Sequence, residues 1–325
     1  MMTHQSKLAF TFPGQGSQSV GMLSELYEVF PEVGETFAEA SEVLGMDLWK
    51  LVSEGPDEAL GQTRNTQPAM LAAGVAVLRV WRASGGAEPQ LVAGHSLGEF
   101  SALVCAGAIG FEAAVRAVAA RARAMQAAVP AGEGGIAALL GLSDEQVLGV
   151  CASASRERGG AVVSAVNFNS PGQVVIAGHA DALERALELA RAAGARRAVR
   201  LAMSVPVHCE LMAPAAGALD SALEHAGLEA PSVPVLHNAD LSEHARPSDI
   251  RAALVAQLTS PVRWTDTVRK LVERGASVLV EPGPGRVLSG LVKRIVKGLP
   301  DADVQALAVY DIASLEAALS LTGRR

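Results

Sequence analysis

Short apolar runs along the chain alternate with longer segments in which apolar residues recur every three or four positions. Residues 7–12 (KLAFTF) and 90–93 (QLVA) are short and apolar, as is typical of strands buried in a sheet. Helical spacing follows at about 20–30, 34–44 and 68–83. This alternation of strand and helix predicts an α/β fold with a mainly parallel sheet.

The middle of the chain, residues 132–203, follows a different order. Ser143 with Gln146 three positions later forms a capping box that opens a helix. The order of strand, helix, two strands, helix and strand is that of a ferredoxin-like unit. Its elements are expected at 135–141, 143–157, 161–167, 173–177, 180–193 and 197–202.

Beyond residue 204 the first pattern resumes, with strands expected at 233–237, 277–281 and 304–309. We therefore expect a discontinuous large α/β domain (1–131 and 204–325) with the ferredoxin-like small domain (132–203) inserted in it. The helices expected in this last part are 209–226, 247–258, 264–274, 286–297 and 312–321.

Composition narrows the class of protein. The chain has 325 residues, of which 50% are hydrophobic and 19% charged, so a large core is available. Its 27 basic and 34 acidic residues give a net charge of −7, which argues against nucleic acid as the main ligand. The three cysteines, at positions 105, 151 and 209, favour neither a disulfide framework nor a metal site, and they fit the reducing cytoplasm.

No segment has the pattern of a targeting or membrane sequence. The first apolar run is stopped by Pro13-Gly14 and is too short for a signal peptide. The longest apolar stretch, 69–78, is well below the roughly 20 residues that span a bilayer. A cytoplasmic protein without a membrane partner is expected.

Gly94-His95-Ser96-Leu97-Gly98 fits G-x-S-x-G, the pattern of a nucleophile elbow. An expected strand precedes it and an expected helix, about 97–106, follows. This context would turn the serine side chain outward at a helix N-terminus, which favours developing negative charge. The alternative is a glycine-rich turn that contains an incidental serine.

A serine nucleophile needs a base, and His208 is the best candidate among seven histidines. Pro206 fixes an extended loop before it, and the order Ser then His matches elbow enzymes. His237 is a weaker rival, and the side chain of His95 should diverge from that of its neighbour Ser96. No acidic residue is evident to orient His208, but a backbone carbonyl can do the same.

The loop after the first strand, residues 13–18, lacks the third glycine of a dinucleotide fingerprint. Such a loop can present a backbone N–H to a ligand oxygen. With the N–H of Leu97 it would form an oxyanion hole; the alternative is an ordinary tight turn.

Arg121 falls at the edge of the apolar face of an expected helix at 111–129, whereas Arg116 and Arg123 fall on the opposite face. An arginine turned inward needs an anion. That anion could be a substrate carboxylate held by both ends of the guanidinium, or an acidic residue in a structural ion pair.

Several segments together resemble malonyl-CoA:acyl carrier protein transacylases, the acyltransferases that load malonate in fatty acid synthesis. The resemblance covers nearly the whole chain and implies a hydrolase-like α/β domain with a ferredoxin-like insertion. It rests on FPGQGSQSVGM (12–22), NTQPAML (65–71), GHSLGEFSAL (94–103), the helix end at 121–130, VNFNSPGQVVIAGH (166–179), SVPVHCELMAPAA (204–216), QLTSPVRW (257–264) and EPGPGRVLSGLVKRI (281–295).

The resemblance implies a role for each matching position. Ser96 would be the acylated nucleophile and His208 its base. The N–H groups of Gln15 and Leu97 would form the oxyanion hole. The main-chain carbonyl of Gln257 would orient His208 in place of an acidic residue.

In the acyl pocket the resemblance implies that Arg121 binds the malonyl carboxylate, with His95 and Val207 also in the pocket. Two positions depart from the family. Val207 stands where the family commonly has Ser, and Ala122 where it commonly has Gly. Both are expected to border the pocket, so selectivity for malonyl over a branched analogue stays open.

The implied partners are malonyl-CoA and acyl carrier protein, with no cofactor, and a monomer is expected. Hydrolysis to the free acid and a non-catalytic carrier-binding module remain as alternatives. Because carrier proteins are acidic, basic residues should receive them. The candidates are Arg191, Arg196, Arg197, Lys293, Arg294 and Lys297.

Overall fold

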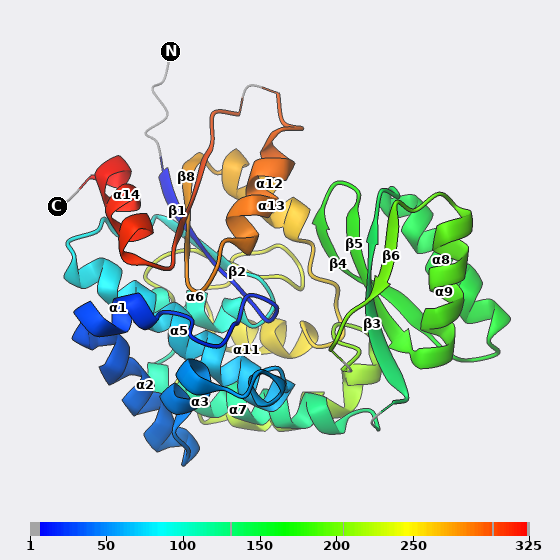
Figure 1. The fold of residues 1–325 in the computed structure, drawn as a ribbon, viewed down its shortest axis with the longest axis horizontal. Coiled ribbons are helices and arrows are strands. Elements are labelled where there is room, and N and C mark those ends of the chain that lie inside the picture. The colour runs from blue at the N-terminus through cyan, green and yellow to red at the C-terminus, as the bar shows by residue number, and fades with distance from the viewer. Residues whose placement is uncertain (1–6, 131, 204, 301, 324–325) are drawn as a thin grey trace.

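The computed structural model describes residues 7–130, 132–203, 205–300 and 302–323. Its larger sheet has five strands in the order β7-β2-β1-β8-β9, and every neighbouring pair is parallel. This confirms the predicted α/β fold (Figure 1). The strands are β1 (Lys7–Phe12), β2 (Leu91–Gly94), β7 (Val235–Leu236), β8 (Ala276–Pro282) and β9 (Gln305–Val309).

The two faces of this sheet bury different helices, because successive side chains of a strand point to opposite sides. Phe10 and Phe12 pack with the core that contains α5 (Thr63–Ala83) and α7 (Phe111–Ala127). Ala9 packs on the other side with residues of α12 (Trp264–Glu273) and α13 (Val287–Val296) (Figure 1). The other described α-helices outside residues 132–203 are α1 (Ser24–Val29), α2 (Pro31–Leu44), α3 (Leu48–Glu54), α4 (Asp57–Leu60), α6 (Gly98–Cys105), α10 (Ala216–Glu224), α11 (Pro247–Ala256) and α14 (Ile312–Thr322).

A smaller sheet lies to the right in Figure 1, with the strand order β4-β5-β3-β6 and only antiparallel pairs. This is the order of a ferredoxin-like sheet. Two helices and a separate apolar core cover one of its faces. The elements are β3 (Gly134–Leu140), α8 (Asp144–Glu157), β4 (Val163–Ser170), β5 (Gln173–His179), α9 (Ala180–Ala192) and β6 (Arg197–Arg200). The expected boundaries meet residues 131 and 204, which lie outside the described ranges, so the division into domains stays a prediction.

Backbone hydrogen bonds join the smaller sheet to the rest of the molecule. The Phe168 N–H donates to the Val262 carbonyl at 2.9 Å, and the Val262 N–H donates to the Val166 carbonyl at 2.9 Å. The edge strand β4 is therefore extended by the segment that leads into α12. This pairing fixes one face of the smaller sheet opposite the end of β2.

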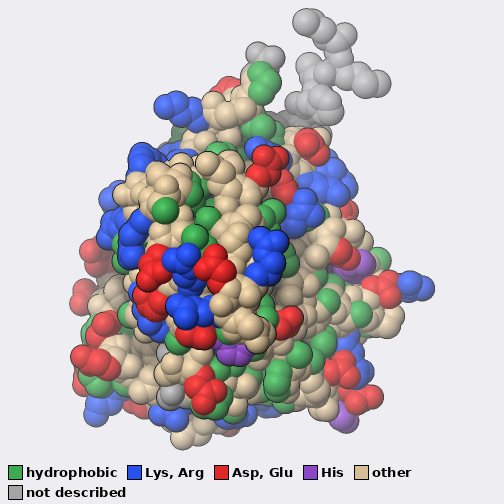
Figure 2. Space-filling model, turned by 90° about the vertical axis from the view of Figure 1, so that its right-hand side faces the viewer, with side chains coloured by type: hydrophobic (Ala, Val, Ile, Leu, Met, Phe, Trp, Pro, Cys, Tyr) green, Lys and Arg blue, Asp and Glu red, His purple; other side chains and the backbone are tan. Residues whose placement is uncertain are grey.

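Figure 2 looks at the molecule from the side of the smaller sheet, and acidic and basic side chains mix over the middle of this face. On the elements of the smaller sheet, Arg185 pairs with Glu157 and Glu188, and Arg200 pairs with Glu184. Basic side chains with few acidic neighbours gather at the upper left of the same view.

The structure corrects several expected elements. The single helix expected at 209–226 is a 3-10 turn (Glu210–Ala215) followed by α10, and Pro214, which lacks an N–H, lies inside that turn. The first helix begins only at Ser24, and α3 and α4 were not predicted. In the described part of the chain, no helix is long and apolar enough to cross a membrane.

Candidate active site

The G-x-S-x-G segment forms a tight turn between β2 and α6. Ser96 has a left-handed backbone with φ of 52°. A Cβ at Gly94 would lie 1.9 Å from the Gly98 carbonyl carbon, and one at Gly98 would lie 2.0 Å from the Phe12 carbonyl oxygen. Both glycines are therefore required by close backbone approach. The strained turn carries the serine hydroxyl at the end of the strand.

His208 lies beside this hydroxyl although it is far away in the sequence. Its Nε2 is 2.7 Å from Ser96 Oγ, and its Nδ1 is 2.9 Å from the Gln257 carbonyl oxygen. Because a carbonyl only accepts, Nδ1 must carry the proton, which leaves Nε2 free to accept from the serine. The structure thus brings together three residues in the arrangement expected of nucleophile, base and orienting carbonyl.

The imidazole of His208 is buried, and its electrostatic surroundings keep it neutral. Burial, and then the positive charge of Arg121, lower its pKa to about 3. The hydrogen bond to the Gln257 carbonyl opposes this shift. A neutral imidazole with a bare Nε2 is the form that can take a proton from the serine.

Arg121 is fully buried and reaches the same hydroxyl. It donates through Nη1 to Gln67 Oε1 at 2.7 Å and through Nη2 to Gln257 Oε1 at 2.8 Å and Ser96 Oγ at 3.3 Å. Burial lowers its pKa to about 10, and the charge of Glu99 opposes that shift, so it stays cationic at neutral pH.

The structural ion pair that the sequence left open for Arg121 is not found. Among the described residues no carboxylate pairs with it, and its Nε has no hydrogen-bond partner. The Arg121 guanidinium next to Ser96 is therefore charged and fully buried, and its Nε has no hydrogen-bond partner in the described structure. Such a group favours binding of an anion.

A cavity of about 930 Å³ opens onto Ser96 and His208. One wall is the open face of the smaller sheet. Gln15, His95, Leu97 and Val207 also line this cavity, whereas Arg121 and Gln257 are buried and do not line it. A cavity of this size is typical of a small-molecule site.

The loop that contains Gln15 packs directly on the elbow. A Cβ at Gly14 would lie 2.4 Å from the His95 carbonyl oxygen, so only glycine fits there. Within the described structure the backbone N–H groups of Gln15 and Leu97 have no acceptor. Their role as an oxyanion hole stays a prediction that this placement supports.

The ring of His95 bonds to the smaller sheet and forms part of the cavity wall. Its Nε2 lies 2.8 Å from Asn169 Oδ1 on β4, and its ring lies against Trp264 with the centroids 5.4 Å apart. Burial lowers its pKa. His95 therefore connects the elbow to the smaller sheet.

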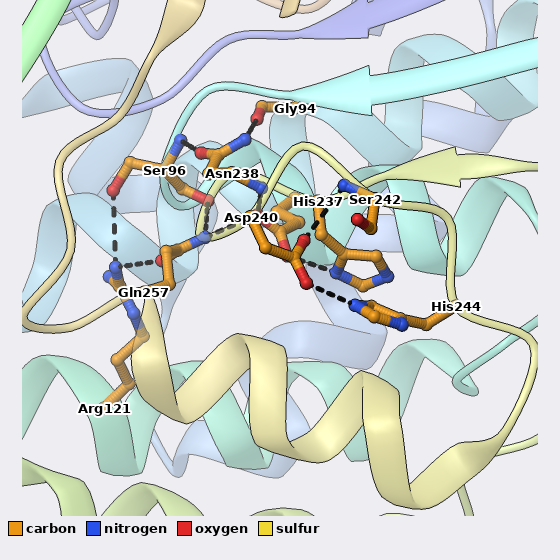
Figure 3. A network of polar contacts seen from close by, with 10 residues as sticks. Gly94, Ser96, Arg121, His237, Asn238, Asp240, Ser242, His244 and Gln257 are labelled. Carbon is orange, nitrogen blue, oxygen red and sulfur yellow. Dashed lines mark hydrogen bonds and ion pairs between the residues drawn. The ribbon is translucent and has the colours of Figure 1, made fainter.

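Sequence reasoning missed the polar network behind the nucleophile, shown in Figure 3. Glu99 accepts from His237 Nδ1 at 2.7 Å and from Gln257 Nε2 at 2.8 Å. Asn238 accepts from the Ser96 N–H at 2.7 Å. His237, the weaker candidate base, thus bonds to Glu99 and not to Ser96. A carboxylate within the apolar segment that follows the elbow was the one available signal.

Comparisons with known proteins agree with this geometry. The acyl transferase domain family matches residues 9–314. A malonyl CoA-acyl carrier protein transacylase of Haemophilus influenzae is 53% identical over 96% of this chain and 97% of its own length. One of Escherichia coli K12 is 52% identical over 97% and 100%, respectively.

Solved structures agree as well. An acyl carrier protein S-malonyltransferase from Vibrio cholerae has a TM-score of 0.90 and 54% identity, covering 96% of this chain and 99% of that one. A malonyl-transacylase solved in complex with a type II PKS acyl-carrier protein has a TM-score of 0.93 and 53% identity, covering 97% and 100%. The chain belongs to the acyl transferase domain family, among the malonyl CoA-acyl carrier protein transacylases.

Proposed function

We propose that this protein transfers a malonyl group from malonyl-CoA to the phosphopantetheine thiol of acyl carrier protein, supplying fatty acid synthesis. The observation that carries the proposal is the contact of one hydroxyl, Ser96 Oγ, with both a neutral imidazole and a buried guanidinium. The first can activate the hydroxyl, and the second can hold an anionic acyl group beside it. The names of the relatives support the same substrates.

In the first half-reaction Ser96 Oγ attacks the thioester carbonyl of malonyl-CoA, and its proton passes to His208 Nε2. The carbonyl oxygen becomes an oxyanion facing the N–H groups of Gln15 and Leu97. Each such donor lowers the barrier by about 3–4 kcal/mol. The C–S bond then breaks, the CoA sulfur takes the proton from His208, and a malonyl-Ser96 ester remains.

The second half-reaction reverses these roles. The carrier thiol gives its proton to His208 and attacks the ester carbonyl. The C–O bond to Ser96 breaks, and the serine oxygen recovers the proton from His208. Two half-reactions through one ester predict ping-pong kinetics.

Arg121 serves both half-reactions by holding the malonyl carboxylate. A bidentate contact would fix the acyl group relative to Ser96, which favours transfer over random attack by water. The guanidinium is already desolvated, so its attraction for an anion is not screened as on a surface.

Three of the six basic residues expected to receive the carrier lie at one end of the smaller sheet, where Leu140 pairs with Gln173. Arg197 pairs with Leu140 in the strand register, and a Cβ on Gly141 would lie 2.9 Å from Arg196 Cγ. Arg294 donates to Gln173 Oε1 at 2.7 Å. The other three candidates are Arg191, Lys293 and Lys297. Among the described residues no ion pair involves any of the six candidates, which supports their availability to an acidic partner.

The remaining expectations belong to the same proposal. We propose that the protein acts as a monomer. The three cysteines are buried free thiols, which supports a cytoplasmic location.

The test is a transfer assay with purified protein, malonyl-CoA and phosphopantetheinylated acyl carrier protein. Malonyl carrier should accumulate with the wild type, and Ser96→Ala should form none. Free malonate as the main product would favour a hydrolase. Transfer that persists in Ser96→Ala would overturn the serine ester.

A further inference from the structure

One fully buried carboxylate, Glu99, lies on α6 behind the nucleophile. It accepts from His237 Nδ1 at 2.7 Å, from the Asn238 N–H at 3.0 Å and from Gln257 Nε2 at 2.8 Å. No Lys or Arg of the described chain contacts it directly. Among the described residues, the one direct partner of Glu99 that can carry a positive charge is His237, and only when its ring is protonated. Desolvation strongly disfavours a buried charge that has no cation near it.

Glu99 acts electrostatically on the buried cation Arg121, and the side-chain amide of Gln257 bonds to both groups. Gln257 accepts through Oε1 from Arg121 Nη2 at 2.8 Å (Figure 3). Through Nε2 it donates to Glu99. A carboxylate only accepts, whereas a guanidinium only donates. The two charges, together with the Ser96 carbonyl that accepts from Nε2 at 3.1 Å, therefore fix which end of the amide faces which partner.

This orientation matters because the two ends of an amide have nearly the same shape. A reversed amide would present its NH₂ group to the NH₂ groups of Arg121 and displace the guanidinium from Ser96. Gln257 also supplies the backbone carbonyl that accepts from His208 Nδ1. Its side chain therefore orients Arg121, and its backbone orients the base His208.

The separation also matters for the anion site. A carboxylate in direct contact with Arg121 would occupy two of its donors and cancel its charge. Because the Gln257 amide lies between Glu99 and Arg121, the Nε of Arg121 has no partner in the described structure, and its Nη2 still donates to Ser96. Glu99 thus compensates the positive charge in a dry site without competing for the donors that a substrate needs.

We propose that Glu99 is a positioning residue that acts through the Gln257 amide, keeping Arg121 charged, oriented and open to the malonyl carboxylate. The inference rests on the proposed malonyl transfer and adds a selectivity role for a residue that touches no substrate. Its signature is a change in the ratio of malonyl to acetyl transfer, because an acetyl group has no carboxylate for Arg121 to bind.

Three variants of the same shape as the wild type test it. Glu99→Gln removes the charge. Glu99→Gln/Gln257→Glu moves the negative charge from position 99 to position 257, where it would contact Arg121 directly. Glu281→Gln is the matched control, since Glu281 is equally buried, accepts from the Leu288 and Ser289 N–H groups at 2.9 and 2.7 Å, and lines no part of the cavity.

For each variant, kcat/KM is measured with malonyl-CoA and with acetyl-CoA, together with the melting temperature. Glu99→Gln should lower the malonyl-to-acetyl ratio by about tenfold, equivalent to about 1.4 kcal/mol. The double variant should keep a low ratio even if it melts close to the wild type. Glu281→Gln should lose thermal stability and keep the wild-type ratio.

An unchanged ratio in Glu99→Gln, with both acyl groups losing rate equally, would overturn the proposal and leave Glu99 a purely structural residue. So would full malonyl selectivity in the double variant, which also decides the matter if Glu99→Gln alone does not fold. Failure of the proposed function is distinguishable, because it would appear as a wild-type protein that transfers no malonyl group.

Discussion

Two buried histidines, His208 and His237, belong to the polar network around Gln257, and they are held in different ways. His208 donates to a neutral carbonyl and faces a serine hydroxyl, whereas His237 bonds a carboxylate. The Nε2 of His237 has no partner in the described structure. The pair with the more familiar histidine–carboxylate contact is therefore not the one that reaches the nucleophile.

The difference suits an anionic acyl group. A carboxylate at Nδ1 of His208 would place a negative charge close to the malonyl carboxylate and compete for Arg121. A carbonyl fixes the same tautomer without that charge. The molecule instead keeps its carboxylate on the far side of Gln257, where it supports Arg121 indirectly.

The largest expected effect separates the two histidines. His208→Ala should slow acylation of Ser96 by about 10²–10⁴-fold, the range for loss of a general base. His237→Gln should cost far less, because that ring does not touch the nucleophile. Single-turnover acylation by malonyl-CoA measures both, and equal losses would contradict the assignment of His208 as the base.

A substitution at Arg121 tests whether its positive charge binds the malonyl carboxylate. Arg121→Ala should lower kcat/KM for malonyl-CoA by about 10–100-fold, since a charged hydrogen bond contributes about 1.5–3 kcal/mol. Acetyl transfer should be retained or raised. Arg123→Ala, on the exposed face of the same helix, is the control and should change neither. An equal loss of kcat/KM for malonyl-CoA and acetyl-CoA would show that Arg121 does not bind the malonyl carboxylate.

A substitution at Val207 would change the cavity wall without changing the hydrogen-bond partners of His208 or His237. Val207 is buried and lines the cavity next to His208. Val207→Ser frees the space of about one methyl group, so kcat/KM for methylmalonyl-CoA relative to malonyl-CoA should rise about tenfold. A fall in this ratio, measured with both donors in competition, would show that Val207 does not limit the pocket.

The smallest effect is an absence of pH dependence. Because the pKa of His208 is lowered to about 3, its base form persists as pH falls through 6.5. The acylation kcat/KM should therefore show no acid limb near 6.5. Over the same interval the unfolded chain takes up a proton that the folded site refuses, so folding stability should decrease as pH falls from about 6.5 toward 3. An acid limb centred at 6.5 would mean that the site is more hydrated than described.

Local patterns predicted the parts of the site that depend on neighbouring residues. The elbow followed from Gly94, Ser96 and Gly98 between a strand and a helix, and the inward position of Arg121 followed from helical spacing. The resemblance to a known family supplied Gln257. Its side-chain role could not be predicted, because Gln257 lies more than 130 residues from Arg121 and from Glu99.

Elements were predicted best where they are long and regular. Helices α3 and α4 have seven and four residues, which is too short for a clear apolar period. The start of α1 was placed too early because the apolar residues Val20 and Met22 precede the helix. The pairing of Val262 with β4 was also missed, since an isolated bridge has no pattern in the sequence.

The most direct test of the account is intact-protein and peptide mass spectrometry after mixing the wild type with malonyl-CoA and no acceptor. The account predicts one malonyl group per chain, on the peptide that contains Ser96, and its disappearance when phosphopantetheinylated carrier protein is added. A Ser96 peptide that stays unmodified while malonyl carrier protein accumulates would contradict it.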